Sequence, residues 1–353
     1  MQNNEDVVYD LIKDHFQCDK RRIHFVALLI VALLKLADSS LAQWSIAINQ
    51  TTRRASRFKR FQRLVREFNF SARVYAQVVW QRYGQDQTIV LTLDRTEYKQ
   101  RGEWVQLLVL GIAHQKMSIP LIWHSANRQG NSPAIARKAL LNVFQKWIQR
   151  TDNQIIYITA DRDFIGPEFR ACALSVWGLI PLIRLRANAL VTQGGRRQRV
   201  SALFDTPTWR VLRKPGQLYK SRLYLSGMRL STGDFVIVYS DRYVAQSQLI
   251  YARRWQIETL FGAFKSRGFD LEGCGLTKHH RIRRLLFILS MSLIWAVETG
   301  EWLVASGHLI PTRQMRDHAQ NVLSLFRHGL DELRDRILNG RPITHLLPLL
   351  SCT

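Results

Sequence analysis

The segment TIVLTLDRTEYKQRGEWVQLLVLGIAHQKMSIPLIWHSA, residues 88–126, decides the fold. It contains three apolar runs, TIVLTLD, WVQLLVLGIAH and SIPLIWHSA, which are separated by the turn signals RGE and QKM. Short apolar runs that alternate with turn residues are typical of consecutive strands. The segment therefore predicts a three-stranded meander.

Helices and strands alternate after this meander. Asn131-Ser132-Pro133 provides a cap and a proline for the start of a helix over Ala134–Arg150. The strand IIYITAD, a short helix around Gly166–Ala173 and the strand GLIPLIRLR follow it. Three strands, a helix, a strand, a helix and a strand is the order of an RNase H-like α/β fold.

The remaining sequence divides around this core. Residues 1–80 are rich in helix formers and predict a helical, basic, DNA-binding region, and residues 81–186 form the first part of the core. Residues 187–245 are polar and strand-like and predict a β-stranded insertion. Residues 246–300 return to the core and carry a helix with a glutamate, and residues 301–353 predict a helical C-terminal region.

The charge of the chain points to a polyanionic partner. It has 51 Lys and Arg against 27 Asp and Glu, a formal net charge of +24, so nucleic acid is the first candidate. We expect no membrane partner, because the apolar runs Phe25–Leu36 and Leu285–Val297 are shorter than the ~20 residues of a span and are typical of buried core helices. The polar, acidic N-terminus is unlike a signal peptide, which predicts a cytoplasmic protein.

The cysteines are scattered, with no zinc-like spacing and no pattern of a disulfide framework. We expect free thiols at Cys18, Cys172, Cys274 and Cys352. His279 and His280 are adjacent, so their side chains point in different directions and a shared metal is not expected.

The stretch TTRRASRFKRFQRLVREF predicts an amphipathic basic helix. Its phenylalanines and leucine recur between arginines, so the apolar side should pack on the protein while the basic side faces DNA phosphates. A solvated charged face is the alternative. The candidate DNA-binding residues are Arg53, Arg54, Arg57, Arg60 and Arg63.

Two aspartates end predicted strands. Asp94 closes TIVLTLD and Asp161 closes IIYITAD, and sites of open α/β sheets gather at the carboxyl ends of strands. If these strands are neighbours, both carboxylates can bind one hard cation, Mg²⁺ or Mn²⁺. Either aspartate alone is more commonly explained as a helix N-cap or a turn former.

A third acid strengthens this hypothesis. Tyr251, Arg254, Glu258 and Lys265 are spaced so that one helix would carry all four on the same side. Glu258 would complete a set of metal ligands for two ions, and Arg254 and Lys265 would hold phosphates. The alternative is an i,i+4 surface ion pair with a solvated lysine beside it.

The run YARRWQIETLFGAFK, residues 251–265, contains Y-(2)-R-(3)-E-(6)-K in full. It resembles the signature of the DDE transposases of bacterial insertion sequences, IS-four group, and LTLDRTEY and ITADRDF resemble the two aspartate motifs of that group. The resemblance implies an acid triad of Asp94, Asp161 and Glu258 in an RNase H-like core that a β-stranded insertion interrupts. It also implies that Tyr251, Arg254 and Lys265 contact DNA phosphates.

The same resemblance implies cut-and-paste transposition through a DNA hairpin. The partners would be double-stranded DNA of the element ends and the target, and a second copy of the chain, for which the C-terminal helices, including Asp331–Leu338, are candidate contacts. An aromatic residue would receive a displaced base. Trp209 is the candidate, with a place in the core of the insertion as the alternative, and Trp177 is expected in the core.

Three rival functions fit parts of this pattern. A nuclease of the same fold would use the same triad to hydrolyse DNA without joining it. A non-catalytic protein could bind element ends alone, although it would not need all three acids. A basic structural protein would leave the order of strands and acids unexplained.

Overall fold

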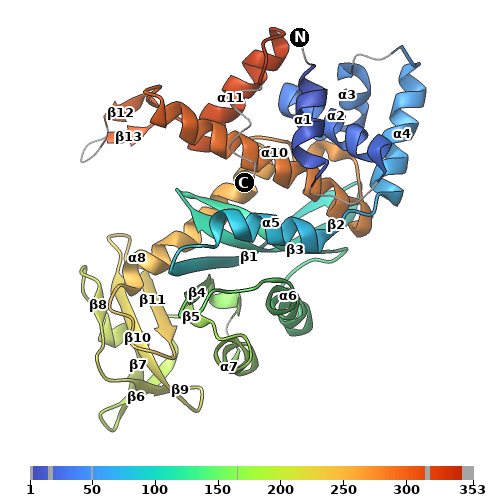
Figure 1. Ribbon diagram of the computed structural model, residues 1–353. Coiled ribbons are helices and arrows are strands. Elements are labelled where there is room, and N and C mark those ends of the chain that lie inside the picture. The colour runs from blue at the N-terminus through green and yellow to red at the C-terminus, as the bar shows by residue number, and fades with distance from the viewer. Residues whose placement is uncertain (1–2, 15–18, 49–50, 165, 315–318, 344–353) are drawn as a thin grey trace.

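The computed structural model describes residues 3–343 apart from 15–18, 49–50, 165 and 315–318. Its centre is a mixed sheet with the strand order β3-β2-β1-β4-β5 (Figure 1). These strands are β1 (Thr88–Gln100), β2 (Glu103–His114), β3 (Met117–Ala126), β4 (Ile155–Ala160) and β5 (Ile180–Arg184). The first three are antiparallel, whereas β1, β4 and β5 run parallel. This arrangement confirms the predicted RNase H-like fold.

Two tight hairpins produce the meander. Gln100 pairs with Glu103 and His114 pairs with Met117, so each loop has two residues. All four loop residues, Arg101 and Gly102 in the first and Gln115 and Lys116 in the second, have positive φ. Such turns match the twist of antiparallel strands. The turns predicted at RGE and QKM are therefore where the sequence placed them.

The β-stranded insertion continues the same sheet beyond β5. The strand β11 (Phe235–Ser240) pairs antiparallel with β5, and β10 (Ser221–Arg229) pairs with β11. Four short strands complete the insertion: β6 (Leu190–Gln193), β7 (Arg196–Arg199), β8 (Arg210–Val211) and β9 (Gly216–Leu218), with the 3-10 helix η2 (Val200–Leu203) between them. An ion pair of 2.9 Å between Arg170 and Asp241 joins the end of β11 to the core. The insertion thus extends the sheet.

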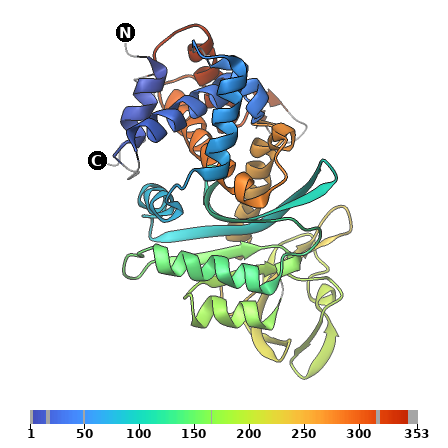
Figure 2. The ribbon, with the colours of Figure 1, turned by 90° about the vertical axis from the view of Figure 1, so that its right-hand side faces the viewer.

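Helices cover both faces of the central sheet (Figures 1 and 2). The helices α6 (Ala134–Trp147) and α7 (Pro167–Ser175) lie on one face. N-terminal and C-terminal helices lie on the other: α1 (Asn4–Ile12), α2 (Lys20–Leu36), α3 (Leu41–Ala47), α4 (Arg54–Glu67), α5 (Ala72–Tyr83), α10 (His279–Ala305) and α11 (Leu325–Leu338). Segments from the two ends of the chain therefore share one layer.

The long helix α10 is the centre of that layer. By length and composition it could cross a membrane, as could the bent pair of α2 and α3, but 83% of its most apolar window is buried inside the protein. The runs Phe25–Leu36 and Leu285–Val297 contribute mostly buried residues to this core, as the sequence predicted. Each run is only part of its helix, because α2 and α10 also include polar residues before or after the apolar run.

Two glycines allow α11 to lie close to α10. A Cβ atom on Gly329 would stand 1.9 Å from the Ala296 carbonyl oxygen, and one on Gly300 would stand 2.1 Å from the Leu325 carbonyl oxygen. The buried face of α11 is therefore used within the chain. A small hairpin of β12 (Thr312–Gln314) and β13 (Ala319–Asn321) precedes α11, which the prediction of a helical C-terminal region did not include. Residues 344–353, part of the predicted dimerisation region, lie outside the described residues.

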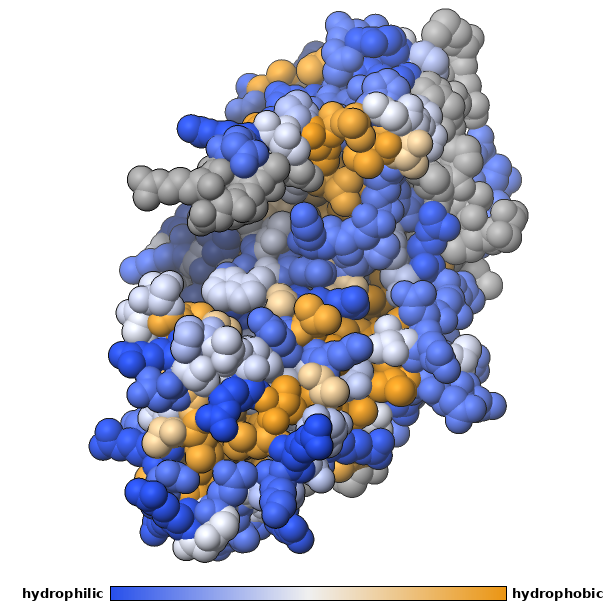
Figure 3. All heavy atoms as spheres, turned by 90° about the vertical axis from the view of Figure 1, so that its left-hand side faces the viewer, coloured by the Kyte–Doolittle hydropathy of each residue, from blue (hydrophilic) through white to orange (hydrophobic). Residues whose placement is uncertain are grey.

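The side of the molecule that carries the insertion has a mixed surface. Figure 3 shows several groups of hydrophobic side chains on it, separated by hydrophilic ones. Leu249 of α8 (Ser247–Ala252) is 68% exposed, whereas the next residue, Ile250, is buried. Leu249 is thus next in sequence to a residue of the buried cluster that contains Ile250 and Tyr251.

A buried carboxylate joins α10 to the end of α5. Glu298 is 2% exposed, and its Oε1 accepts hydrogen bonds from the Tyr83 hydroxyl at 2.7 Å and from Arg82 Nε at 3.1 Å. Burial raises the pKa of Glu298 to about 7, although these two partners oppose the shift. The folded protein therefore holds a proton on Glu298 more tightly than the unfolded chain does.

This shift predicts a pH-dependent stability. Between the ordinary pKa of 4.5 and the folded value of about 7, the folded state binds more protons, so the free energy of unfolding should fall as the pH rises through this window. At ~1.4 kcal/mol per pKa unit, the loss is on the order of 3 kcal/mol at most. Denaturant unfolding at several pH values should show this fall in the native chain and a flatter profile in Glu298→Gln. Glu103→Gln, a variant of an exposed glutamate, is the control and should keep the native profile. If the free energy of unfolding fell equally in Glu298→Gln, the pH dependence could not be assigned to Glu298.

Candidate active site

The parallel pairing of β1 with β4 brings two aspartates together. Leu93 pairs with Ala160, and the next residues of the two strands are Asp94 and Asp161. The prediction that Asp94 ends its strand was wrong, since β1 continues to Gln100 and Asp94 itself pairs with Val109 of β2. Asp94 instead lies where β1 loses β4 as a neighbour.

The glutamate segment is an interrupted helix. It consists of α8, the 3-10 helix η3 (Arg253–Trp255) and α9 (Gln256–Phe264). Lys265 follows α9 with φ −92° and ψ −134°, outside the helical region. The prediction of one regular helix carrying Tyr251, Arg254, Glu258 and Lys265 was therefore wrong. The tighter turn of a 3-10 helix changes the angle between side chains, so spacing at 100° per residue does not describe this segment.

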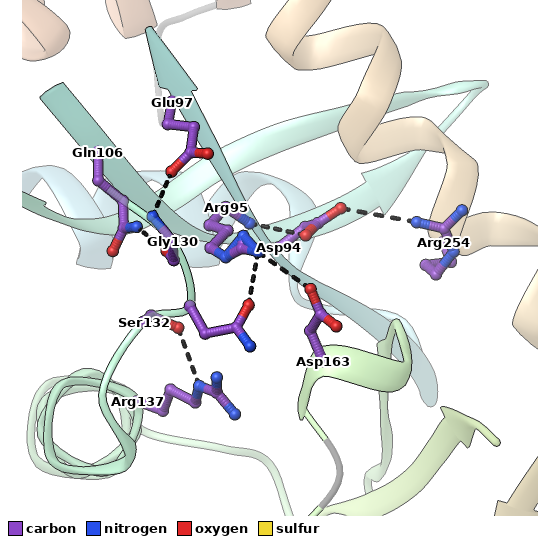
Figure 4. Close-up of polar contacts among 10 residues, drawn as sticks. Asp94, Arg95, Glu97, Gln106, Gly130, Ser132, Arg137, Asp163 and Arg254 are labelled. Carbon is purple, nitrogen blue, oxygen red and sulfur yellow. Dashed lines mark hydrogen bonds and ion pairs between the residues drawn. The ribbon is translucent and has the colours of Figure 1, made fainter. Parts of the chain in front are cut away.

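Arg254 lies between two of the predicted acids. Its Nη2 donates to Glu258 Oε1 at 2.8 Å, and its Nη1 is 3.6 Å from Asp94 Oδ2. Figure 4 shows the guanidinium directed at the Asp94 carboxylate from the glutamate segment. The Arg254 side chain is only 5% exposed, and its guanidinium carbon stands 4.5 Å from the centre of the Trp255 ring. One guanidinium thus partly neutralises both carboxylates.

Burial dominates the electrostatics of Asp94. It raises the pKa of this carboxyl to about 6, while the backbone N–H of Arg95, at 2.7 Å, and the Arg254 guanidinium act in the opposite direction. The negative charges of Asp161 and Glu258 contribute to the rise. The three acids are therefore close enough to influence one another, and a bound cation would favour the ionised form of Asp94.

Several polar atoms around the acids are buried and unpaired with any described residue. They are Asp161 Oδ1, the Tyr251 hydroxyl and Arg254 Nε. Burial also raises the pKa of Tyr251, so this hydroxyl remains protonated and can donate a hydrogen bond. Buried polar atoms without partners are costly, and a carboxylate oxygen in this state is a suitable ligand for a hard cation. The donor set fits a divalent metal.

The acids do not form a closed metal site by themselves. Among the residues that the structure describes, no three His, Cys, Asp or Glu side chains are grouped closely enough to hold a metal ion. Instead, the Arg254 guanidinium contacts both Asp94 and Glu258. A metal that uses both carboxylates would have to displace the guanidinium.

Lys265 lies farther along β1. Its Nζ is 2.8 Å from Glu272 Oε1 of the 3-10 helix η4 (Leu271–Cys274), and it donates to the Glu97 carbonyl oxygen at 3.2 Å. The ammonium also stands 5.7 Å from the centre of the Tyr98 ring. The structure therefore places Lys265 three strand residues beyond Asp94, paired with an acid that a phosphate would have to replace.

A second arginine braces the loops beside Asp94. Arg95 Nη2 donates to Asn131 Oδ1 at 2.7 Å and to Asp163 Oδ2 at 3.0 Å. Figure 4 shows the contact with Asp163. Asp163 belongs to the 3-10 helix η1 (Arg162–Phe164), and Asn131 precedes α6. Sequence reasoning missed this brace, although Arg95 and Asp163 lie within the two aspartate motifs, LTLDRTEY and ITADRDF. It fixes the loops around the site.

The basic helix is α4, and its residues Phe61, Leu64 and Val65 are buried. Arg53, Arg54, Arg60 and Arg63 are exposed, whereas Arg57 is half-buried and donates to the Ser45 carbonyl oxygen at 2.8 Å and to the Thr52 carbonyl oxygen. Part of the Arg57 guanidinium is therefore occupied in linking α4 to α3 and is not directed at solvent.

The two tryptophans of interest have different surroundings. Trp209 is half-buried against the cluster that contains Tyr251 and Ile250, and its Nε1 donates to Ser247 Oγ at 3.2 Å. Trp177 is 1% exposed and donates to Asn142 Oδ1, which is the core position that the sequence predicted. Trp255, which the sequence analysis did not single out, is 56% exposed beside Arg254.

The other residues singled out in the sequence have simple positions. Cys172 and Cys274 are free thiols, while Cys18 and Cys352 lie outside the described residues. The His279 and His280 rings are 5.7 Å apart at the start of α10 and are nearly perpendicular.

Comparison with known proteins agrees with this geometry. The family model of the transposase DDE domain matches residues 86–295, which is more than half of the chain and includes all three acids. The chain belongs to the DDE transposase family. Members of this family use divalent metal ions to cleave DNA, so the protein is a metal-dependent, DNA-cleaving transposase that binds DNA.

No curated protein sequence matches the transposase significantly. Among solved structures, it is similar to a piggyBac transposase synaptic complex with hairpin DNA, determined by cryo-electron microscopy. The TM-score is 0.46 with 11% sequence identity, over 99% of this chain and 81% of that chain. A likeness of this degree carries no weight for function.

The position of Arg254 predicts how the transposase binds metal without DNA. Replacement Arg254→Ala removes a cation that competes for Asp94 and Glu258, so the affinity of the DNA-free protein for Mn²⁺ should rise, by roughly tenfold. Titration calorimetry and the electron paramagnetic resonance of Mn²⁺ measure this affinity.

The neighbouring Arg253 offers a matched control. It is exposed, so Arg253→Ala removes the same charge from the same segment without opening the site and should leave the affinity almost unchanged. Circular dichroism verifies that both variants fold. An Arg254→Ala protein that binds Mn²⁺ no better than the native protein would show that the guanidinium does not compete with metal.

Proposed function

We propose that the protein carries out cut-and-paste transposition of a bacterial insertion sequence of the IS-four group, through a DNA hairpin. Asp94, Asp161 and Glu258 would hold two Mg²⁺ or Mn²⁺ ions. The observation that carries this proposal is the Arg254 guanidinium between Asp94 and Glu258. A site that only hydrolyses DNA needs the acids. A buried arginine within the site suits an enzyme that keeps one phosphate bound through cleavage, hairpin formation and joining.

The residues around the acids have distinct tasks in this proposal. When bound, the metal ions activate the attacking oxygen and stabilise the leaving oxygen of an in-line displacement at phosphorus. Arg254 turns from the carboxylates to the scissile or neighbouring phosphate, which it can bind with two parallel hydrogen bonds. The protonated Tyr251 hydroxyl donates to the same backbone, and Lys265 exchanges Glu272 for a phosphate farther along the strand.

An exposed aromatic ring next to the acids suits a displaced base. Trp255 presents such a ring, with Arg254 against it, so a base could stack on it. Trp209, the residue that the sequence suggested, packs beside Tyr251 and has its N–H already bonded. We therefore propose Trp255 as the main stacking residue and Trp209 as a support for Tyr251.

The larger assembly is part of the same proposal. Two DNA ends must meet, so a homodimer would form on the terminal repeats, and the outer surface of α11 is available for it because the inner face packs on α10. The exposed arginines of α4 would bind duplex DNA outside the active site. Activity on chromosomal DNA would place the protein at the bacterial nucleoid in the cytoplasm.

One experiment separates this function from its rivals. The protein is incubated with Mg²⁺ and DNA that carries the ends flanking its own gene, and the products are resolved on a denaturing gel. Nicks, hairpins and joined products in succession support transposition. Nicks alone would favour the nuclease, and retarded but uncut DNA would favour a non-catalytic end-binding protein.

The acid triad generates a direct prediction. Asp94→Asn, Asp161→Asn and Glu258→Gln should each lower cleavage by several orders of magnitude, because each loses a metal ligand, while binding of the ends changes little. Asp163→Asn is the matched control, since this aspartate pairs with Arg95 and its amide can still accept that hydrogen bond. Cleavage assays and gel retardation measure the two effects. Mg²⁺-dependent cleavage by any triad variant would contradict the assignment.

The two tryptophans give a second prediction. Trp255→Ala should leave the first nick intact and reduce hairpin formation by roughly tenfold or more, because a displaced base loses its stacking surface. Trp209→Ala should mainly lower the melting temperature, since it leaves a gap beside Tyr251. Product gels and thermal denaturation distinguish the outcomes, and a selective loss of hairpin in Trp209→Ala would reverse the assignment.

A further inference from the structure

A pocket with cationic and aromatic walls lies away from the acids, along the free edge of the sheet. It has a volume of about 530 Å³ and is bounded by β3, the start of α5, one side of α6 and the first turns of α10. The strand β3 ends the strand order, so no other strand of the described residues covers its outer edge. Pockets of this size hold small ligands or parts of larger ones.

Aromatic side chains form much of the pocket wall. The Trp123 ring is fixed by its Nε1, which donates to the Arg283 carbonyl oxygen at 3.1 Å, and by contact with Tyr75 at 5.2 Å between ring centres. The Phe70 ring centre is 6.4 Å from that of Trp123, with an angle of 29° between the ring planes. Trp147 of α6 belongs to another part of the wall. Trp123, Phe70 and Trp147 are all half-buried, so their rings keep accessible surface.

The charged side chains that line the pocket are basic. Arg73, His124 and Arg283 line it and are exposed, and no Asp or Glu is among the described residues that line it. Arg73 and Arg283 make no side-chain ion pair or hydrogen bond to the described part of the chain. Arg284, in contrast, is occupied with the Phe68 carbonyl oxygen at 2.5 Å and helps to fix the pocket's edge.

The pocket continues into the basic surface of α4. A smaller hollow shares Phe68 with it and is lined by Arg21 and Arg22 of α2 and by Arg63 of α4. Its acid, Glu67, pairs with Arg66. Exposed cations therefore run from the N-terminal helices past Phe68 to Arg73 and Arg283. A chain of phosphates could follow this path, with an aromatic pocket beside it.

We propose that this pocket, Phe70–Trp123–Trp147, is a second DNA-binding site that takes an unstacked base, with Arg73 and Arg283 on the flanking phosphates. The size and aromatic walls suit a base, and the cations suit its backbone. A membrane would also meet the cations, but its lipids have no planar groups to stack against the rings. An acidic peptide offers such a group only where it carries an aromatic residue, whereas every nucleotide has a planar base. The inference rests on DNA binding by the transposase and does not depend on cleavage or hairpin formation.

The test uses the full chain with Asp94→Asn, so that cleavage cannot interfere. Fluorescence anisotropy measures the affinity for a short single-stranded oligonucleotide and for the same strand in a duplex. Ala139 is an exposed residue of the pocket wall, and Ala139→Trp fills the pocket without changing its charge. It should weaken single-strand binding by about tenfold and duplex binding far less. The double variant Arg73→Gln, Arg283→Gln should weaken both and flatten their salt dependence.

Arg313→Gln serves as the charge control, because this exposed arginine lies on the distant hairpin of β12. A second measurement leaves the pocket unchanged, so it does not depend on whether Ala139→Trp folds. A 5-iodouracil oligonucleotide is photo-crosslinked to the Asp94→Asn protein, and the crosslinks should map to Trp123 or Trp147. Unchanged single-strand binding by folded Ala139→Trp, or crosslinks elsewhere only, would overturn the site. The proposed function would be unaffected, since cleavage by the native protein is measured separately.

Discussion

The parallel pairing of β1 with β4 is the constraint on which the active site depends. It places Asp94 and Asp161 at equivalent positions of neighbouring strands, although one lies within a long strand and the other just beyond a short one. The antiparallel meander holds β1 from its other side, so Asp94 keeps a fixed backbone where β4 ends. Backbone hydrogen bonds thus supply the rigidity that two carboxylates need to share a cation.

Arg254 gives the site its second property, which is charge balance without a ligand. Three acids near one another would repel, and burial already raises the pKa of Asp94 to about 6. A buried guanidinium between Asp94 and Glu258 reduces that cost and reaches there from an irregular segment. An ion pair of this kind is stable in the free protein and can be exchanged for metal and phosphate, because both replace the lost charges.

The insertion and the helical layer extend the molecule in different directions from the acids. The insertion continues the sheet beyond β5 and packs Trp209 beside Tyr251, so it borders the active site. The helices of both chain ends cover one sheet face and carry the exposed arginines of α4. The surfaces that would meet DNA therefore occupy both the insertion side and the free edge at β3, with the sheet as a rigid frame between them.

The sequence by itself determined the order of strands and helices, both hairpin turns and the buried character of α10, because these follow from local patterns. One short motif also singled out the three candidate acids. The tertiary structure alone decided where the acids and cations lie. Asp94 falls inside β1, a 3-10 turn interrupts the glutamate helix, and Lys265 pairs with Glu272. The sequence also did not predict the exposed Trp255 ring beside Arg254, the contacts of Arg95 or the pocket at β3. Their roles depend on residues distant in the chain, and side-chain spacing carries no information about which partners the fold brings near.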